Sequence, residues 1–335
     1  MNSRRLFPWL MGILAGATMI ALIAFAGACD EGNTAGPAGP GPAPGPGPGP
    51  SLVTASDWVS SVDWATATVV QLDMVEGGGS AYSFSPSNMT FEAGRPYIMR
   101  ITNPASNQEK HYFATEGLGD FYKVIATRKI QTADAEYKAP HFEAVELLIG
   151  GSLEIYFVPV LGGTYDFLCT IPGHAPGGMV GQITITGGEG NVLDLEIASD
   201  FNMGLTQDAR KSGGHSVWES AVETEVVIWE EPYSFRPPDL ALQKDVGYKL
   251  TLSNPAGARS KHYYTASDFY RTVVVRKSED SQAEIKPLYF KAVELLIGGS
   301  TELFIVPTAA GTFEALCTIE GHAAAGMIGT VVVSP

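Results

Sequence analysis

The chain contains the same block of residues twice, and this duplication limits the folds that it can adopt. Residues 138–152 read KAPHFEAVELLIGGS, and residues 286–300 read KPLYFKAVELLIGGS, at an offset of 148. The offset is again 148 between LCTIPGH at 168–174 and LCTIEGH at 316–322, and it is 151 between the two KHY triplets. Solenoid repeats are about 20–50 residues long. A period near 150 therefore predicts two tandem copies of a whole domain.

The residue pattern within each copy is that of β-strands. Short runs rich in Val, Ile, Tyr, Phe and Thr are separated by Gly, Pro and Asn. Evenly spaced short strands of this kind are typical of a β-sandwich. A short helix is expected near 120–123. The predicted strands are 66–72, 97–102, 153–158, 164–169 and 180–186 in the first copy, and 224–229, 248–252, 272–276, 302–306, 312–317 and 328–333 in the second.

Residues 1–28 have the features of an export signal. Arg4 and Arg5 precede a long apolar stretch, as in a secretory signal peptide or a twin-arginine signal. The stretch ends in AGAC at 26–29, which resembles a bacterial lipobox with Cys29 as the lipidated residue. The alternatives are ordinary cleavage before this cysteine or retention of the stretch as a membrane anchor. All three place the rest of the chain in the periplasm or on the extracytoplasmic face of a bacterial membrane.

The chain after this signal divides into four predicted segments. Residues 29–55 form a linker, because its Gly, Pro and Ala composition cannot bury a core and favours an extended spacer. Domain 1 is predicted at 56–190, a polar interdomain linker at 191–214 and domain 2 at 215–335. An anchor followed by a spacer would hold both domains off the membrane while they reach partners there.

The charge of the chain argues against nucleic acid as a ligand. The sequence has 21 basic and 36 acidic residues, which gives a net charge of −15, whereas nucleic-acid binding needs a basic face. An acidic surface suits a basic protein partner instead. The three cysteines are too few for a disulfide scaffold.

Each copy carries one cysteine, two histidines and one methionine at matching positions. A thiolate and two imidazoles with a weak axial thioether form the ligand set of a type 1 (blue) copper site, and structural zinc sites rarely use Met. Inert packing or a disulfide is the alternative for a single cysteine. Four matching ligand types in both copies favour two copper sites. The predicted ligands are His111, Cys169, His174 and Met179 in the first copy, and His262, Cys317, His322 and Met327 in the second.

The spacing of the ligands fits a strand-loop-strand unit. Cys169 ends one predicted strand, Met179 begins the next, and His174 lies on the loop between them. His111 comes from a different part of the copy. The ligands are therefore expected to meet at one end of the sandwich.

On these residues the chain resembles the cupredoxin family, and specifically a tandem pair of type 1 copper domains with rusticyanin-like Cys-x4-His-x4-Met loops. The resemblance covers about residues 60–187 and 215–335. It implies a Greek-key β-sandwich and one-electron transfer between Cu(I) and Cu(II). It also implies that His174 and His322 are the exposed exits for electrons, and their small, apolar neighbours favour such exposure.

Two positions near the ligands are expected to affect the reduction potentials of the sites. Many members have a small polar residue after the upstream histidine, near the sulfur, where this chain has Tyr112 and Tyr263. Contacts to the sulfur tune the reduction potential. In the ligand loops, Pro172 of the first copy corresponds to Glu320 of the second. This charge is expected to separate the two sites in potential or in choice of partner.

The histidine count argues against a catalytic copper centre. Tandem cupredoxin domains also resemble copper nitrite reductases and small laccases, which need further histidines. Only His141 and His215 remain after the four predicted histidine ligands, and both are expected to be ordinary surface residues. Leu168 and Leu316, rather than His, precede the two cysteines. A type 2 or trinuclear copper centre is therefore unsupported, and the chain is predicted to be an electron-transfer protein rather than an enzyme.

Together these features predict an exported, membrane-tethered protein that carries single electrons through two type 1 copper sites. The expected partners are redox proteins such as a c-type cytochrome or a terminal oxidase or reductase. The alternative function is storage of copper or its delivery to an oxidase. Ligands held inside a sandwich favour electron transfer, because delivery sites usually use exposed Met or His clusters.

Overall fold

The computed structural model describes residue 59 and residues 62–115, 121–188 and 214–335. The predicted export signal, the lipidation site Cys29 and nearly all of both predicted linkers lie outside these residues. In this part of the chain, no helix combines the length and the apolar character needed to cross a bilayer.

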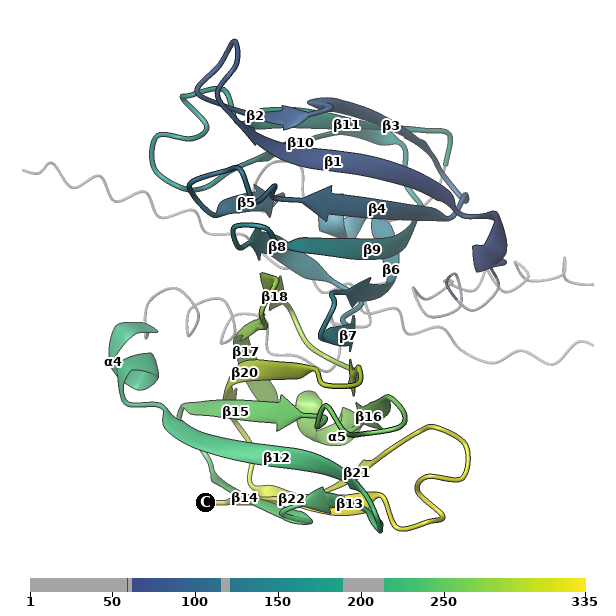
Figure 1. Ribbon diagram of the computed structural model, residues 1–335, viewed down its shortest axis with the longest axis vertical. Helices are drawn as coiled ribbons and strands as arrows, with labels where there is room; N and C mark the ends of the chain where they lie inside the picture. The colour runs from purple at the N-terminus through teal and green to yellow at the C-terminus, as the bar shows by residue number, and fades with distance from the viewer. Residues whose placement is uncertain (1–58, 60–61, 116–120, 189–213) are drawn as a thin grey trace, which may run out of the picture. The chain divides into compact units, whose positions relative to one another are not determined.

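The first repeat consists of two facing β-sheets (Figure 1). Its strands pair in two series, in which β1 with β4 and β11 with β3 run parallel. One series is β2 (Tyr82–Ser85), β1 (Thr68–Glu76), β4 (Tyr97–Thr102), β9 (Ser152–Pro159), β6 (Ile125–Gln131) and β7 (Ala135–Lys138). The other is β8 (Phe142–Leu147), β5 (His111–Ala114), β10 (Gly163–Leu168), β11 (Val180–Thr186) and β3 (Asn88–Glu92). Short 3-10 helices occupy η1 (Trp64–Thr66) and η2 (Phe121–Lys123).

The second repeat has the same strand order. Its first series is β13 (Tyr233–Arg236), β12 (Val222–Glu230), β15 (Tyr248–Ser253), β20 (Ser300–Pro307), β17 (Val273–Glu279) and β18 (Ala283–Pro287). Its second is β19 (Ala292–Leu295), β16 (His262–Tyr264), β21 (Gly311–Leu316), β22 (Ile328–Ser334) and β14 (Asp239–Gln243), with a single bridge between Thr265 and Leu316 connecting β16 to β21. Two short helices are α4 (Gly214–Glu219) and α5 (Ser267–Tyr270). The predicted all-β fold with two tandem copies is confirmed.

Alternating side chains build the core of each sandwich. In β3 the buried residues are Met89 and Phe91, and their neighbours along the strand are exposed. The matching strand β14 buries Leu240 and Leu242 in the same way. Successive side chains of a strand point to opposite faces of the sheet, so this pattern places one face against the core and the other in water.

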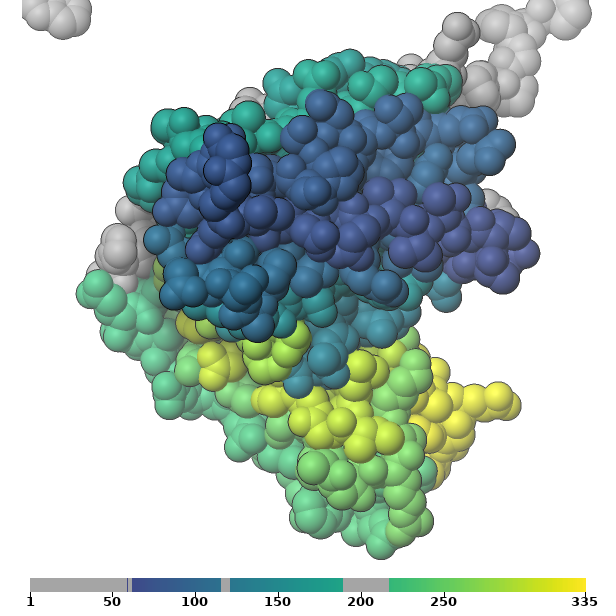
Figure 2. Space-filling model, turned by 45° about the horizontal axis from the view of Figure 1, so that its top comes forward, coloured from purple at the N-terminus to yellow at the C-terminus, as the bar shows by residue number. Residues whose placement is uncertain are grey.

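The two repeats share their sheets. β18 of the second repeat pairs antiparallel with β8 of the first, and β19 pairs antiparallel with β7. The two exchanges are equivalent, because β7 corresponds to β18 and β8 to β19 in the duplicated sequence. The first series of strands of each repeat therefore forms one continuous sheet with the second series of the other repeat. Figure 2 shows atoms of the first repeat, in purple to teal, lying directly against atoms of the second, in green to yellow.

Four of the buried glutamates on the shared strands are each paired with lysine. Unpaired charges in such a position would be strongly destabilising, and the lysines offset this cost. Glu136 is paired with Lys129 and Lys138, Glu146 with Lys110, Glu284 with Lys277, and Glu294 with Lys261.

Candidate metal centres

Among the residues that the structure describes, two clusters each combine one cysteine with two histidines, one cluster in each repeat. In each cluster the ligand atoms lie within 4.8 Å of one another. The first cluster is His111, Cys169 and His174, and the second is His262, Cys317 and His322. The sequence therefore predicted the members of both clusters, and the fold brings them together from strands and loops far apart in the chain.

The loop after Cys169 is wound by its own backbone hydrogen bonds. The amide of His174 donates to Ile171 O at 3.1 Å, and the amide of Met179 donates to His174 O at 2.9 Å. The amide of Cys169 donates to Met179 O at 3.1 Å, which closes the loop. These bonds hold Cys169, His174 and Met179 together within one closed loop. Met179 is fully buried there.

The second loop repeats this winding with different residues. The amide of His322 donates to Ile319 O at 3.1 Å, that of Met327 to His322 O at 3.0 Å, and that of Cys317 to Met327 O at 3.1 Å. Met327 is also fully buried. Conserving these bonds despite the change from PGHAPGG to EGHAAAG shows that the backbone, rather than the intervening side chains, determines the loop.

A glycine before each methionine is required by the turn. Gly178 has φ +111° and Gly326 has φ +109°, a region that residues with a Cβ rarely adopt. A Cβ at Gly178 would also come within 2.8 Å of the carbonyl oxygen of Tyr82. A side chain at this point would therefore displace the ligand loop.

The upstream histidine of the first cluster is fixed by the loop that precedes β5. Asn103 is fully buried, and its Nδ2 donates to Glu109 O at 2.9 Å and to Leu147 O at 3.1 Å. The carboxylate of Glu76 accepts from the backbone amides of Gln108 and Glu109 at 2.8 and 2.9 Å. These contacts place His111 at the start of β5 with its ring inside the sandwich.

Two carboxylates set the proton positions of the first cluster. Glu76 Oε1 lies 3.0 Å from His111 Nε2, and Glu109 Oε2 lies 2.8 Å from His174 Nε2. A carboxylate only accepts, so each Nε2 carries the hydrogen and each Nδ1 presents a lone pair. The two Nδ1 atoms face each other at 3.0 Å, and Cys169 Sγ lies 3.5 Å from His174 Nδ1. Two lone pairs and a sulfur that converge in this way fit a bound cation.

Burial and hydrogen bonds adjust the charges of these groups. Burial lowers the pKa of His111, which favours the neutral, ligating imidazole. Burial alone would raise the pKa of Glu76, but hydrogen bonds from the amides of Gln108 and Glu109 and from His111 bring it below its ordinary value. Glu76 is therefore ionised at neutral pH and able to orient the ring.

The sulfur atom accepts a backbone hydrogen bond in both clusters. The amide of Tyr112 donates to Cys169 Sγ at 3.3 Å, and that of Tyr263 donates to Cys317 Sγ at 3.4 Å. Burial raises the pKa of both thiols, and these amides oppose that effect. A hydrogen bond to sulfur stabilises the thiolate, which is the form that binds metal.

The second cluster has the same geometry with one carboxylate fewer. His262 Nδ1 and His322 Nδ1 lie 3.1 Å apart, and Cys317 Sγ lies 3.5 Å from His322 Nδ1. Glu230 Oε1 lies 2.9 Å from His262 Nε2. Burial alone would raise the pKa of Glu230, but hydrogen bonds from Arg259, Ser260 and His262 lower it to about 2.

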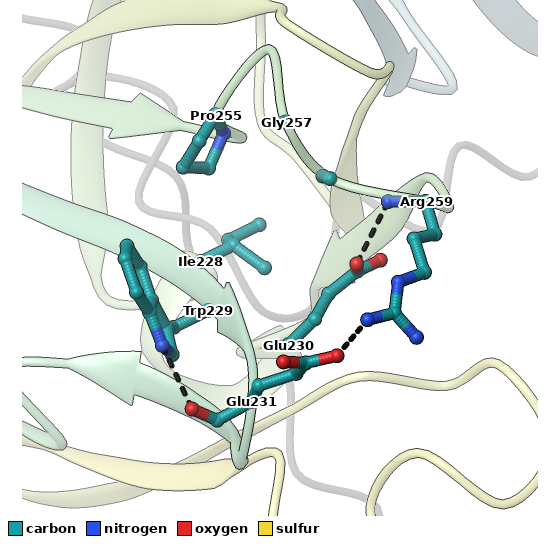
Figure 3. A pocket seen from close by; sticks show the side chains of 8 residues that line it. Ile228, Trp229, Glu230, Glu231, Pro255, Gly257 and Arg259 are labelled. Atoms are coloured by element: carbon teal, nitrogen blue, oxygen red, sulfur yellow. Dashed lines mark hydrogen bonds and ion pairs between the residues drawn. The ribbon is translucent and has the colours of Figure 1, made fainter.

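The carboxylate of Glu230 also contributes to the wall of an open pocket (Figure 3). Its Oε2 accepts from the amide of Arg259 at 2.7 Å, and the guanidinium of Arg259 pairs with Glu231. The indole of Trp229 stands on another side of the pocket and donates to Glu231 O at 3.0 Å. Glu230 therefore contacts the pocket on one side and Nε2 of His262 on the other.

The exposure predicted for the downstream histidines is wrong for the first cluster. His174 is only 3% exposed, because Glu109 covers Nε2 and Tyr82 stacks on the ring at 3.9 Å and 9°. In the second cluster Ser260 takes the place of Glu109, Tyr233 stacks less closely at 4.6 Å and 25°, and His322 is partly exposed. Small neighbours in the ligand loop could not reveal this, because the covering groups come from β2 and from the loop that precedes β5.

Of the two remaining histidines, His141 differs from the expected surface exposure, and the side chain of His215 is not described. His141 was expected at the surface but is fully buried, with Nδ1 3.3 Å from the carbonyl oxygen of Tyr122. His215 lies within α4, and its side chain is outside the described part of the structure. His141 belongs to no cluster of potential metal ligands among the described residues.

The sequence interpretation missed the groups that orient and cover the histidines. Glu76 and Glu230 occupy equivalent places at the ends of β1 and β12, and Tyr82 and Tyr233 begin β2 and β13. The duplication itself carried a signal for the tyrosines, which recur at the offset of 151 found for the KHY triplets. The two glutamates lie 154 residues apart, so their equivalence follows from the strand ends rather than from that offset. Glu109 has no such signal, since its counterpart is Ser260.

Comparison with known proteins gives likenesses in structure only. No protein-family model matches the chain, and no curated protein matches its sequence. A multicopper oxidase from Campylobacter jejuni is 10% identical over 81% of this chain, which spans 65% of that oxidase, with a TM-score of 0.31. A copper nitrite reductase from Nitrosomonas europaea is 11% identical over 80% of this chain and 94% of its own, with a TM-score of 0.27. Auracyanin from Roseiflexus castenholzii is 17% identical over 35% of this chain and 100% of its own, with a TM-score of 0.25.

Proposed function

We propose that this protein is a tandem cupredoxin that binds one copper ion in each repeat at a type 1 site and transfers single electrons. The observation that carries the proposal is the convergence of two Nδ1 atoms and one Sγ in each repeat, with the outward nitrogen of at least one histidine fixed by a carboxylate. Imidazole and thiolate ligands with a weak axial Met suit copper in this role.

Bound copper would supply a centre that gains and loses one electron without large changes in its ligands. The protein's part is to hold the ligands still. His111, Cys169, His174 and Met179 would hold the metal in the first site, and His262, Cys317, His322 and Met327 would do so in the second. Burial of every ligand residue except His322 limits the access of water, and the outer carboxylates hold the rings of His111, His174 and His262 in place.

The proposed cellular role follows from the sequence. We propose that the protein is tethered outside a bacterial membrane through Cys29 or an uncleaved anchor, and that it exchanges electrons with a protein such as a c-type cytochrome or a terminal oxidase or reductase. The net charge of −15 would favour a partner with a basic docking face. No additional catalytic copper is proposed, since only His141 and His215 lie outside the two ligand sets.

The copper content and visible spectrum of the purified chain test this function. We expect two copper ions per chain and an intense thiolate-to-copper band that bleaches with ascorbate and returns on oxidation. Copper that binds without this band, or that a mild chelator removes at once, would overturn electron transfer and favour storage or delivery. Matched C169S and C317S variants should each retain one copper ion and one band.

A further inference from the structure

Tyr112 connects the first cluster to the second repeat. Its backbone amide donates to Cys169 Sγ at 3.3 Å, and its hydroxyl donates to Glu284 Oε1 at 3.2 Å. Glu284 lies on β18, the strand that the second repeat adds beside β8. A single residue therefore contacts the sulfur of one cluster and a carboxylate of the opposite repeat.

Tyr263 makes the reciprocal connection. Its amide donates to Cys317 Sγ at 3.4 Å, and its hydroxyl donates to Glu136 Oε1 at 3.2 Å. Glu136 lies on β7, which pairs with β19 of the second repeat. The same connection made in both directions follows from the reciprocal exchange of strands, and it is absent from a single sandwich taken alone.

The carboxylate that receives the Tyr112 hydroxyl is held in place. Glu284 is 8% exposed, and its Oε2 accepts from Lys277 Nζ at 2.7 Å. Lys286, two residues along β18, places its Nζ 3.2 Å from the Tyr112 hydroxyl and 4.4 Å from the centre of its ring. Glu284 and Lys286 of the opposite repeat therefore contact the hydroxyl of Tyr112, and Lys286 also contacts its ring. These contacts limit how the backbone amide of Tyr112 can move relative to Cys169.

We propose that Tyr112 and Tyr263 are positioning residues through which each repeat adjusts the copper site of the other. The position of the amide sets the strength of its hydrogen bond to sulfur, and this bond governs how strongly the thiolate donates to a bound metal. A change on β18 therefore alters the first site, and a change on β7 alters the second. This inference rests on the proposed function, because copper is the readout.

The sharpest test places a substitution in one repeat and measures the site in the other. E284Q is introduced into the full chain with C317S, which leaves the first site intact, and separately with C169S, which leaves the second intact. We expect copper affinity of the first site to fall about tenfold and its thiolate band to shift. The second site, which lies in the same repeat as the substitution, should be unchanged. E136Q should give the mirror result.

Two further variants separate positioning from loss of structure. Y112F removes the hydroxyl and keeps the ring, and it should reproduce the effect of E284Q on the first site. E302Q removes a charge from β20 of the second repeat, where Glu302 pairs with Lys249 and contacts neither tyrosine, and it should change neither site. Thermal unfolding of each variant confirms that the fold is retained.

The outcomes distinguish this inference from the proposed function. Unchanged affinity and spectrum of the first site in both E284Q and Y112F, or equal changes at both sites, would overturn the inference while leaving two copper sites in place. If the unsubstituted chain bound no copper, the proposed function would fail. Amide hydrogen exchange of Tyr112 in the metal-free chain then decides the positioning role: faster exchange in Y112F and E284Q supports it, and unchanged exchange overturns it.

Discussion

Glu109 Oε2 lies 2.8 Å from Nε2 of His174, whereas the residue at the corresponding sequence position of the second repeat is Ser260, whose hydroxyl donates to Glu230 at 2.7 Å. The two clusters therefore share their ligands but differ in charge at the outer edge of one imidazole. Glu109 is half-exposed, so water screens part of its effect on the site. This difference gives two otherwise matching sites distinct electrostatic surroundings.

The charge at Glu109 should lower the reduction potential of the first site. An anion near the copper stabilises the more positively charged oxidised state, so E109S should raise the potential of the first site by on the order of tens of millivolts. S260E should lower that of the second. Redox titration of the thiolate band in chains with one intact site measures both shifts. E320Q in the second ligand loop removes the other charge that distinguishes the two sites. A larger shift in the reduction potential of the second site in E320Q than in S260E would contradict the importance of the charge at Glu109.

Removing the charge of Glu76 should weaken copper binding at the first site. The carboxylate of Glu76 accepts from the amides of Gln108 and Glu109 and from His111 Nε2. In E76Q the NH2 group of the carboxamide would replace one of the accepting oxygens and would face one of these donors. Loss of such an orienting partner typically weakens metal binding by about 10–100-fold. Competition with a chelator measures the change. E92Q, on the exposed side chain paired with Arg95, serves as the control and should leave the affinity unchanged.

The tyrosine rings over the downstream histidines should slow loss of metal to different extents. Tyr82 stacks on His174 at 3.9 Å and 9°, and Tyr233 stacks on His322 at 4.6 Å and 25°. Y82L should therefore speed removal of copper from the first site by a chelator more than Y233L speeds removal from the second. Stopped-flow loss of the thiolate band gives both rates. Equal acceleration, or none, would show that the stacking does not protect the sites.

The shared strands should make stability sensitive to acid. Burial alone would raise the pKa values of Glu136 and Glu284, but their lysine partners bring both below the ordinary value of 4.5. A carboxyl whose folded pKa is depressed stabilises the fold above its unfolded pKa, and this stabilisation is lost as the pH falls through the folded pKa. Glu146, whose pKa burial raises, acts in the opposite direction.

The double variant E136Q/E284Q isolates this effect. It should be less stable than the unsubstituted chain at neutral pH, and the difference in unfolding free energy should shrink as the pH falls below about 4.5. Urea unfolding at a series of pH values measures that difference. E302Q again serves as a control that removes a single charge away from the shared strands. A difference that stayed constant with pH would show that these carboxylates are not the titrating groups.

Strand prediction succeeded where one face of a strand meets water. The predicted strands at 97–102 and 180–186 coincide with β4 and β11. Others have ends that differ from those of the structure by one to four residues, as at β1. The strands that join the repeats were not predicted. Every residue of β8 is buried, because the strand lies between β5 and β18, and it therefore lacks the alternation that marks a strand.

The sequence by itself determined the duplication, the all-β fold and the two sets of candidate ligands. These follow from local patterns and from spacing along the chain, which survive without knowledge of distant contacts. Only the tertiary structure decided that the repeats exchange strands, that Glu109 and Tyr82 cover His174, and that each tyrosine beside a cluster reaches the opposite repeat. These relationships join residues tens to more than a hundred positions apart, and pairing between strands, rather than local propensity, brings them together.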